Sequence, residues 1–340
     1  MIRLLCLVLV TVAMTAAAQS VDFIEVPVKV KSSFRALSVP DGSVAWISGS
    51  RGWIGRSTDA GGHWSFFRIH GDSSADYRTL YAHDSLRAVV GNTGSPAVIR
   101  ETTDGGRTWT EVYRNEHPDA FLDGIGFWDR RNGIVFGDPI NGRILILKTT
   151  DGGHSWSEAP EEQRPVVIKG EASFAASGTT IRCHGKSSVW IATGGTRASL
   201  FHTTDRGKHW SRSDTPMASG KPGAGIFSLC VTGAGTIALA GGDYQTPERT
   251  AGNYCLGTLP GDHWVVPSGG PSGYRSSIEM VRQGWLLAGG PGGADISMDG
   301  GRSWQLIPSP EGLNVFSKSR SGKLLLAGGR NGIWKVVFPR

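Results

Sequence analysis

The sequence lacks the features that mark the common metal-dependent and thiol-dependent enzymes. It has four cysteines in 340 residues and no Cys-x-x-Cys pair, which argues against a zinc knuckle or a dithiol redox site. Neither His-x-His nor His-Glu-x-x-His occurs, so we expect no metal site. The glycine-rich segment 289–293 does not open a helix, so a dinucleotide fingerprint is missing and no cofactor is expected.

Long apolar runs and blocks of like charge are also missing. No apolar run reaches 18 residues beyond the N-terminus, so we expect no membrane span. The net charge is +6, but no run of five basic residues occurs. We therefore expect no nucleic-acid partner.

The first 18 residues resemble a secretory signal. Arg3 supplies a positive start, residues 4–13 form a short apolar stretch, and Ala16 and Ala18 fit an A-x-A cleavage site before Gln19. We expect residues 1–18 to be removed, residues 19–340 to form one domain, and the protein to be periplasmic or extracellular. Three cysteines remain, for which buried free thiols or one disulfide are the alternatives: Cys183, Cys230 and Cys255.

Glycine and tryptophan are abundant, with 49 and 12 residues respectively, and much of this excess lies in one repeated motif. The motif, Ser/Thr-x-Asp-x-Gly-x-x-Trp, is called the turn motif below. Its aspartates and tryptophans recur 40 to 54 residues apart, a spacing typical of propellers and solenoids. They are Asp59 and Trp64, Asp104 and Trp109, Asp151 and Trp156, Asp205 and Trp210, and Asp299 and Trp304, with a degenerate copy at Trp264.

Each turn motif has a mechanical interpretation. Its aspartate can accept hydrogen bonds from nearby backbone N–H groups, and its glycine permits the positive φ of a tight hairpin. The tryptophan begins the next strand and is expected to wedge between neighbouring repeats. An acid repeated five times in this role is structural, so we do not expect these aspartates to be catalytic.

A second repeated marker is an apolar strand ending in glycine, which occurs seven times. Adding a strand before it and two after it gives four strands per repeat, the pattern of a propeller blade. The seventh repeat, residues 314–337, lacks its fourth strand, and residues 23–28 have no partner of their own. The sequence therefore predicts an all-β, seven-bladed propeller of four-stranded antiparallel blades, closed by the N-terminal strand.

The turn motif is similar to the Asp-box (BNR) repeat of sialidases and other propellers. With segments 34–39, 121–124, 133–139 and 170–178, the chain resembles the photosystem II stability/assembly factor-like family. That resemblance implies a soluble propeller that binds a partner protein and is not an enzyme. It does not identify the partner.

The inner strand of each blade should begin at the rim of the central channel. The residues at these starts are Arg35, Arg78, Asp123, Glu171, Phe227, Arg275 and Asn314. Arginines suit a carboxylate or phosphate, so Arg35, Arg78 and Arg275, with Asp123 and Glu171 between them, form the predicted ligand site. The alternative is that these charges pair with one another and only brace the channel.

We expect an exported, monomeric binding propeller that recognises a protein or glycan partner without catalysis. The alternative function is a sialidase-like glycoside hydrolase. Tyr77 and Tyr274 each precede a rim arginine, and Glu171 and Asp123 could supply carboxyl groups. Their order and spacing do not match the sialidase pattern. Gly137-Asp138-Pro139 is interpreted as a turn at a strand end.

Overall fold

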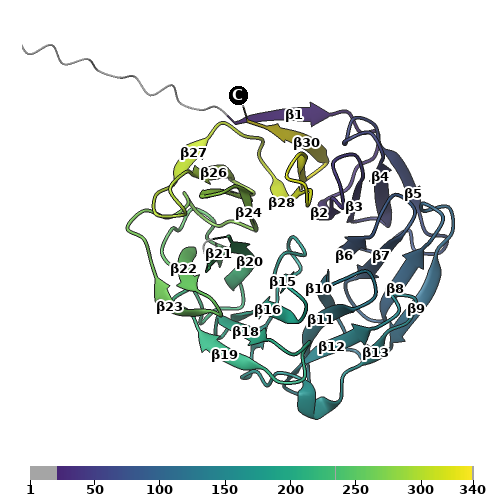
Figure 1. Cartoon of the computed structure of the whole chain (residues 1–340), viewed down its shortest axis with the longest axis horizontal. Helices are drawn as coiled ribbons and strands as arrows, with labels where there is room; N and C mark the ends of the chain where they lie inside the picture. Colours follow the sequence, from purple (N-terminus) through teal and green to yellow (C-terminus); the bar gives the residue numbers. More distant parts are fainter. Residues whose placement is uncertain (1–20, 234, 339–340) are drawn as a thin grey trace, which may run out of the picture.

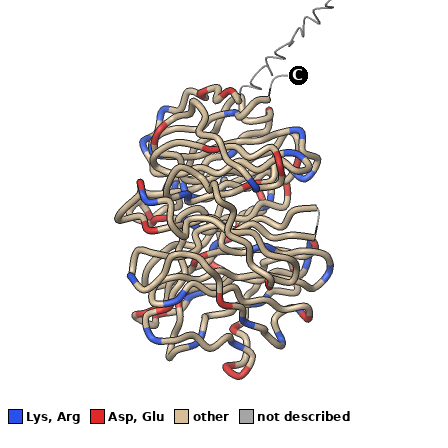
Figure 2. Tube along the Cα trace, turned by 90° about the vertical axis from the view of Figure 1, so that its left-hand side faces the viewer, with Lys and Arg blue, Asp and Glu red and all other residues tan. Residues whose placement is uncertain are grey.

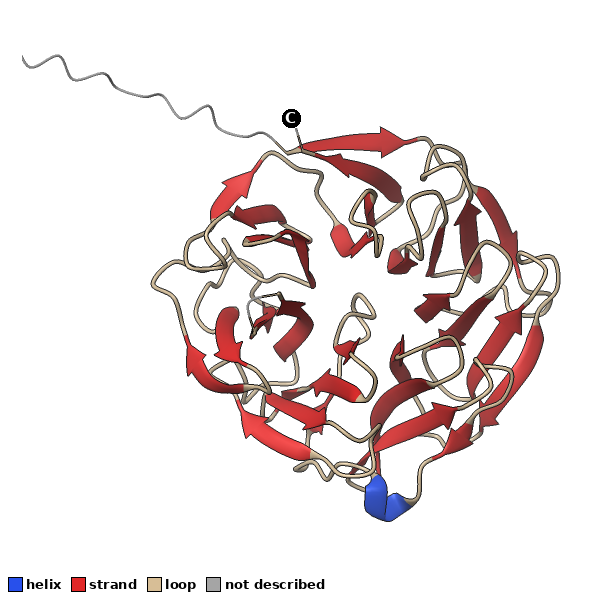
Figure 3. Ribbon diagram, in the orientation of Figure 1, coloured by secondary structure: helices blue, strands red, loops and turns tan. Residues whose placement is uncertain are grey.

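The blades form a closed ring around a central channel (Figure 1). The computed structural model describes residues 21–233 and 235–338. The predicted signal segment 1–18 lies outside these residues. Apart from one 3-10 helix, η1 (Glu161–Gln163), the regular elements are strands (Figure 3). The predicted all-β, seven-bladed propeller is therefore confirmed.

Each blade is an antiparallel sheet whose strands run from the channel outward. The bounds of the strands in blades one to three are β2 (Phe34–Ser38), β3 (Ala45–Gly49), β4 (Trp53–Ser57) and β5 (Ser65–Arg68); β6 (Tyr77–Ala82), β7 (Ala88–Asn92), β8 (Ala97–Thr102) and β9 (Thr110–Asn115); and β10 (Leu122–Phe127), β11 (Gly133–Ile140), β12 (Arg143–Thr149) and β13 (Ser157–Glu158).

Blades four to six follow in the same way. Their strands are β15 (Ile181–His184), β16 (Ser188–Ala192), β18 (Ser199–Thr203) and β19 (Ser211–Asp214); β20 (Ala224–Thr232), β21 (Thr236–Asp243), β22 (Tyr254–Thr258) and β23 (Asp262–Val265); and β24 (Ser277–Arg282), β25 (Trp285–Gly290), β26 (Gly293–Ser297) and β27 (Gln305–Ile307). Two short strands, β14 (Glu171–Ala172) and β17 (Gly194–Gly195), extend blade five toward blade three.

Blade seven joins the two ends of the described chain. From the channel outward it contains β28 (Leu313–Lys318), β29 (Leu325–Gly329), β30 (Gly332–Val337) and β1 (Asp22–Val26). The register runs from Asp22 opposite Val337 to Val26 opposite Ile333. The N-terminal strand thus completes the last blade, as the sequence predicts.

The core consists of hydrophobic clusters between neighbouring blades rather than one central mass. At the junction that closes the ring, Ile47 of blade one packs with Val315 and Leu326 of blade seven, and all three are buried. Basic and acidic residues are mixed over the side of the ring (Figure 2). No helix among the described residues has the length and hydrophobicity needed to span a bilayer.

The turn motif has the hydrogen bonds that its sequence predicts. In blade two the Thr102 hydroxyl donates to Asp104 and accepts the backbone N–H of Gly106, at 3.0 and 2.9 Å. Asp104 Oδ1 also accepts the backbone N–H of Thr108 at 2.9 Å. These donors lower the pKa of Asp104 to about 2, with the Thr108 N–H the largest cause. The carboxylate is therefore a fixed part of the turn.

The tryptophans of the motif lie between blades, but most are only half-buried. Trp156 is buried at 8% exposure and packs edge-on against Phe127 at 5.8 Å between ring centroids. Trp109 packs edge-on against Trp46 at 6.3 Å and keeps one side toward solvent. The expectation of complete burial is met at Trp156 alone among the motif tryptophans.

Trp156→Ala should therefore destabilise the protein most within this set. We expect a loss of about 3 kcal/mol, at the lower end for a buried aromatic residue. Trp109→Ala and Trp264→Ala should cost less, because their rings are half-exposed. Urea unfolding of the three variants measures the difference, and equal losses would contradict the packing described here.

The cysteines do not form disulfides. Cys183, Cys230 and Cys255 are all free thiols, the first half-buried and the others buried. Burial raises the pKa of each thiol, to about 12 at Cys230. Of the two alternatives raised by the sequence, the structure has the free thiols.

Candidate functional site

One mouth of the channel opens into a cavity of about 410 Å³. We call it the upper cavity. Four of the seven rim residues predicted from the sequence line it: Arg35 of β2, Arg78 of β6, Phe227 of β20 and Asn314 of β28. The two arginines therefore come together on one face, as predicted.

A β-bulge explains why these side chains reach the channel. The register between the two innermost strands slips by one residue at each of Arg35, Arg78, Phe227 and Asn314. Such a bulge leaves the extra residue outside the ladder and re-aims its side chain. The same slip occurs at Asp123 in blade three.

Arg35 has no acidic partner. Its Nη1 donates a long bond of 3.4 Å to the backbone oxygen of Ala176, and its buried Nε has no acceptor among the described residues. Burial and the neighbouring charge of Arg78 lower the pKa of Arg35. Arg78 pairs with Asp76 at 2.7 Å and keeps one edge toward the cavity. The cavity thus holds a positive charge that lacks a counter-ion.

Aromatic rings form the opposite wall of the upper cavity. Phe174 stacks on Phe227 with 4.0 Å between centroids, and Tyr274 meets Phe227 edge-on at 4.7 Å. Tyr244, half-exposed, stands at the edge of this group. A cavity with cations on one side and aromatic rings on the other suits a ligand group that is both anionic and partly apolar.

Residues 173–180, here called the channel loop, cross the channel before β15 (Figure 1). Ser173–Ala176 line the upper cavity, and Ser177–Thr179 line a second cavity on the other side. The loop is anchored by a bond of 2.7 Å between the hydroxyls of Thr179 and Ser228. It therefore separates the two cavities.

Two of the predicted site residues lie elsewhere. The Arg275 guanidinium is 2% exposed and pairs with Asp295 at 2.5 Å inside blade six. Glu171, also 2% exposed, accepts Arg212 at 3.1 Å and the Thr193 hydroxyl at 2.7 Å. Glu171 belongs to β14 and not to an inner strand, and no bulge precedes β24 after Arg275. Both are buried structural ions, outside the lining of the upper cavity.

Asp123 lies behind the cavity wall, and its neighbour Asp138 reaches the cavity. Asp138 occupies a bulge of β11, where the register slips between Gly137 and Pro139. It is therefore inside a strand and not in the strand-end turn expected from Gly137-Asp138-Pro139. Its carboxyl lines the upper cavity and an adjoining hollow of about 630 Å³, which we call the groove.

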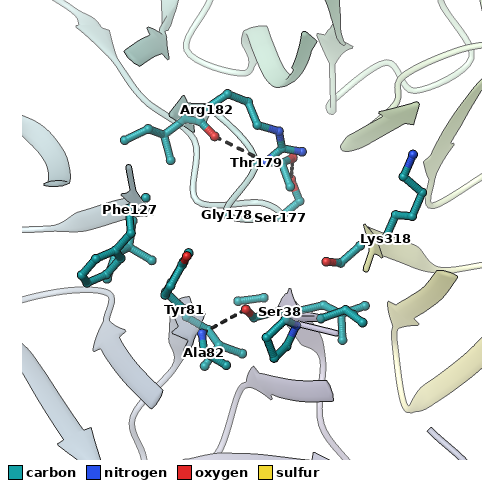
Figure 4. A pocket seen from close by; sticks show the side chains of 18 of the residues that line it. Ser38, Tyr81, Ala82, Phe127, Ser177, Gly178, Thr179, Arg182 and Lys318 are labelled. Atoms are coloured by element: carbon teal, nitrogen blue, oxygen red, sulfur yellow. Dashed lines mark hydrogen bonds between the residues drawn. The ribbon is translucent and has the colours of Figure 1, made fainter. Parts of the chain in front are cut away.

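The second cavity, the lower cavity, has a volume of about 260 Å³ (Figure 4). Its basic residues are already engaged: Arg182 lies 3.6 Å from Glu279, and the Lys318 ammonium donates to the Met280 carbonyl. Arg320 contacts the Tyr81 hydroxyl. Because these cations have partners, the lower cavity is the weaker candidate for a ligand site.

No group of three or more His, Cys, Asp or Glu side chains suited to a metal ion occurs in residues 21–233 and 235–338. The charged chemistry of the upper cavity is therefore that of its arginines, its tyrosines and Asp138.

No family model and no curated protein matches the sequence. Among solved structures, one described as YCF48 bound to D1 peptide has a TM-score of 0.65 at 14% identity, covering 94% of this chain and 96% of that chain. YCF48 from Cyanidioschyzon merolae has a TM-score of 0.63 at 14% identity, covering 92% and 98%. The structure of U3-55K has a TM-score of 0.65 at 12% identity, covering 94% and 98%. At these identities the likeness supports the propeller fold alone.

Proposed function

We propose that this protein is an exported, non-catalytic binding propeller of the Asp-box type, which recognises an acidic segment of a partner protein in the upper cavity. The observation that carries the proposal is Arg35. A guanidinium that is mostly withdrawn from water and lacks a carboxylate partner is costly, and an anionic ligand would remove that cost. Arg78 stands beside it and can share the same ligand group.

Two further features support a protein segment as the ligand. The aromatic wall offers Phe174, Phe227 and Tyr274 to an apolar side chain next to the acidic group. The YCF48 structure with a D1 peptide shows that a propeller of similar fold can hold a peptide. Export rests on the A-x-A pattern before Gln19, and N-terminal sequencing of exported protein tests it.

The glycoside hydrolase alternative has one supporting observation, which is that Tyr274 and Arg35 line the same cavity. Burial raises the pKa of Tyr274, with desolvation the main cause, and this opposes its use as a nucleophile. Glu171 is engaged with Arg212, and no other glutamate lines the upper cavity among the described residues. Turnover of a fluorogenic sialoside would favour the hydrolase.

Replacing both cavity arginines, in Arg35→Ala/Arg78→Ala, should weaken binding of an acidic peptide by about 2–5 kcal/mol, because a buried charge on the ligand would lose its partners. The ligand is found with an array of acidic peptides, each paired with its Asn or Gln counterpart, and a parallel glycan array. Calorimetry then gives the affinities.

The matched control is Arg330→Ala, which removes an exposed arginine from the edge of the same cavity. It should change the affinity by less than about 1 kcal/mol, as is usual for exposed charges. Equal binding of acidic and neutral peptides, or selective binding to glycans, would contradict the proposal.

A further inference from the structure

The wall of the upper cavity contains a pair of buried carboxyl groups. Asp123 is fully buried, and neither of its oxygens has an N–H or hydroxyl partner among the described residues. The group beside it is the carboxyl of Asp138, with which it shares a hydrogen bond. Two carboxyl groups can share a hydrogen bond only when one of them carries a proton. The pair is therefore built to hold at least one proton.

Asp138 is the exposed end of this pair. Its Oδ1 accepts the backbone N–H of Ser173 in the channel loop at 3.1 Å. Its side chain borders both the upper cavity and the groove, together with Phe121. The proton of the pair therefore lies where a ligand group in the upper cavity would meet the wall.

Burial raises the pKa of both groups. Desolvation raises the pKa of Asp138 to about 6, and desolvation together with the charge of Asp138 raises that of Asp123 well above its usual range. Asp138 is therefore the member that ionises first as the pH rises toward neutral. Its ionisation places a negative charge in the same cavity as Arg35 and Arg78.

The other charged and titratable groups around Asp138 come from several blades. The upper cavity is lined by Arg35, Arg78, Arg330, Tyr244 and Tyr274, with Asp76 paired to Arg78, and the groove by Asp119, Lys169 and Glu171. Glu171 is paired with Arg212. In the described residues neither hollow has a histidine or cysteine in its lining. Asp138 is thus the group placed to change the charge of the cavity near neutral pH.

We propose that the Asp123–Asp138 pair couples ligand binding in the upper cavity to proton binding, so that the cavity accepts an anionic group when Asp138 is protonated and rejects it when Asp138 is ionised. The inference rests on the proposed function, because it assumes an anionic ligand between Arg35 and Arg78. The protonated carboxyl donates a hydrogen bond to the anion, whereas the ionised carboxylate repels it and competes for the arginines. Asp138 is then the residue that determines both the charge selectivity and the pH dependence of the site.

Benzenesulfonate is a suitable probe, because it is aromatic and stays anionic across the tested range, so any pH dependence comes from the protein. Calorimetric titrations at pH 5.5 and 7.5 should show affinity about 20-fold weaker at the higher pH, the loss expected when the binding-competent protonated fraction falls. Asp138→Asn, which stays neutral and keeps the shape of the side chain, should bind with nearly equal affinity at both pH values. Neutral benzenesulfonamide should show no pH dependence with either protein.

A second readout needs no ligand. Because the pKa of Asp138 is raised by folding, its protonated form favours the folded state, and that contribution is lost as the pH rises from about 4 through about 6. Asp138→Asn should therefore raise the melting temperature at pH 7.5 more than at pH 5.5. An equal change at both pH values would show that Asp138 does not bind a proton in this range.

The outcomes separate the two proposals. Wild-type affinity that is equal at both pH values, or an unchanged pH dependence in Asp138→Asn, overturns the coupling and leaves the anion site standing. If benzenesulfonate does not bind at either pH, the anion site and the coupling both fail. Arg35→Ala/Arg78→Ala should lose binding at both pH values, which distinguishes removal of the anion site from removal of the proton.

Discussion

Deleting residues 21–28 should open the ring and lower the stability of the protein by at least about 4 kcal/mol. The strand β1 buries Val21 and Val26, each worth about 1.5–3 kcal/mol, and Phe23 packs on Phe316 at 6.3 Å. The deletion would also leave β30 as a bare edge, which promotes pairing between molecules. Thermal unfolding and size-exclusion chromatography should show a sharply lower melting temperature and aggregation.

The matched control for this deletion is Ile24→Thr. Ile24 lies in the same strand but is 52% exposed, and threonine retains a good β-propensity. This variant should melt close to the parent. A deletion variant that is as stable and monomeric as the parent would refute the closure of blade seven by the N-terminal strand.

Arg275→Ala should cost about 3–5 kcal/mol, because it strands a buried charge on Asp295. That carboxylate is fully buried, and its remaining donors are the backbone N–H and hydroxyl of Ser272, at 3.1 and 2.6 Å. Arg35→Ala removes a guanidinium that has no acidic partner, so its effect on stability should be within about 0.5 kcal/mol. Urea unfolding of the two variants compares a structural arginine with a binding arginine.

A double replacement tests the reason for the loss at Arg275. In Arg275→Met/Asp295→Leu no charge is left unpaired, and apolar groups of similar size replace the ion pair. Such replacements are often neutral, so most of the stability lost in Arg275→Ala should return. If Arg275→Ala and Arg35→Ala were equally destabilising, the separation of their roles would be wrong.

The propeller could be predicted from the sequence because its signals are periodic. The turn motif and the glycine-ended strand recur in register, and each copy independently indicates the same blade. The unpartnered segment at residues 23–28 and the incomplete last repeat could be matched, because a ring leaves no other place for either.

The candidate site was predictable where the blades are regular. Arg35, Arg78, Phe227 and Asn314 stand at equivalent bulges, so their position along the inner strand determines where they point. Blade four departs from this pattern, because the channel loop separates Glu171 from its inner strand. The shared spacing of Cys183 and Cys230 carried the missing signal, since it aligns Thr180, and not Glu171, with Phe227.

Arg275 and Asp138 were assigned incorrectly for a different reason. Whether an arginine faces the channel or its own blade depends on a buried partner such as Asp295, which is 20 residues away in the chain. Asp138 lies before a proline, a context that suggests a turn. Only the paired strand reveals that it is a bulge directed into the cavity.

A crystal structure of the protein with its tightest-binding acidic peptide is the most direct test of the anion site. The peptide's acidic group should lie in the upper cavity with its oxygens about 2.8 Å from guanidinium nitrogens of both Arg35 and Arg78, and an apolar side chain should contact Phe227. A peptide bound in the lower cavity or along the outer strands, with both arginines unchanged, would contradict the proposed site.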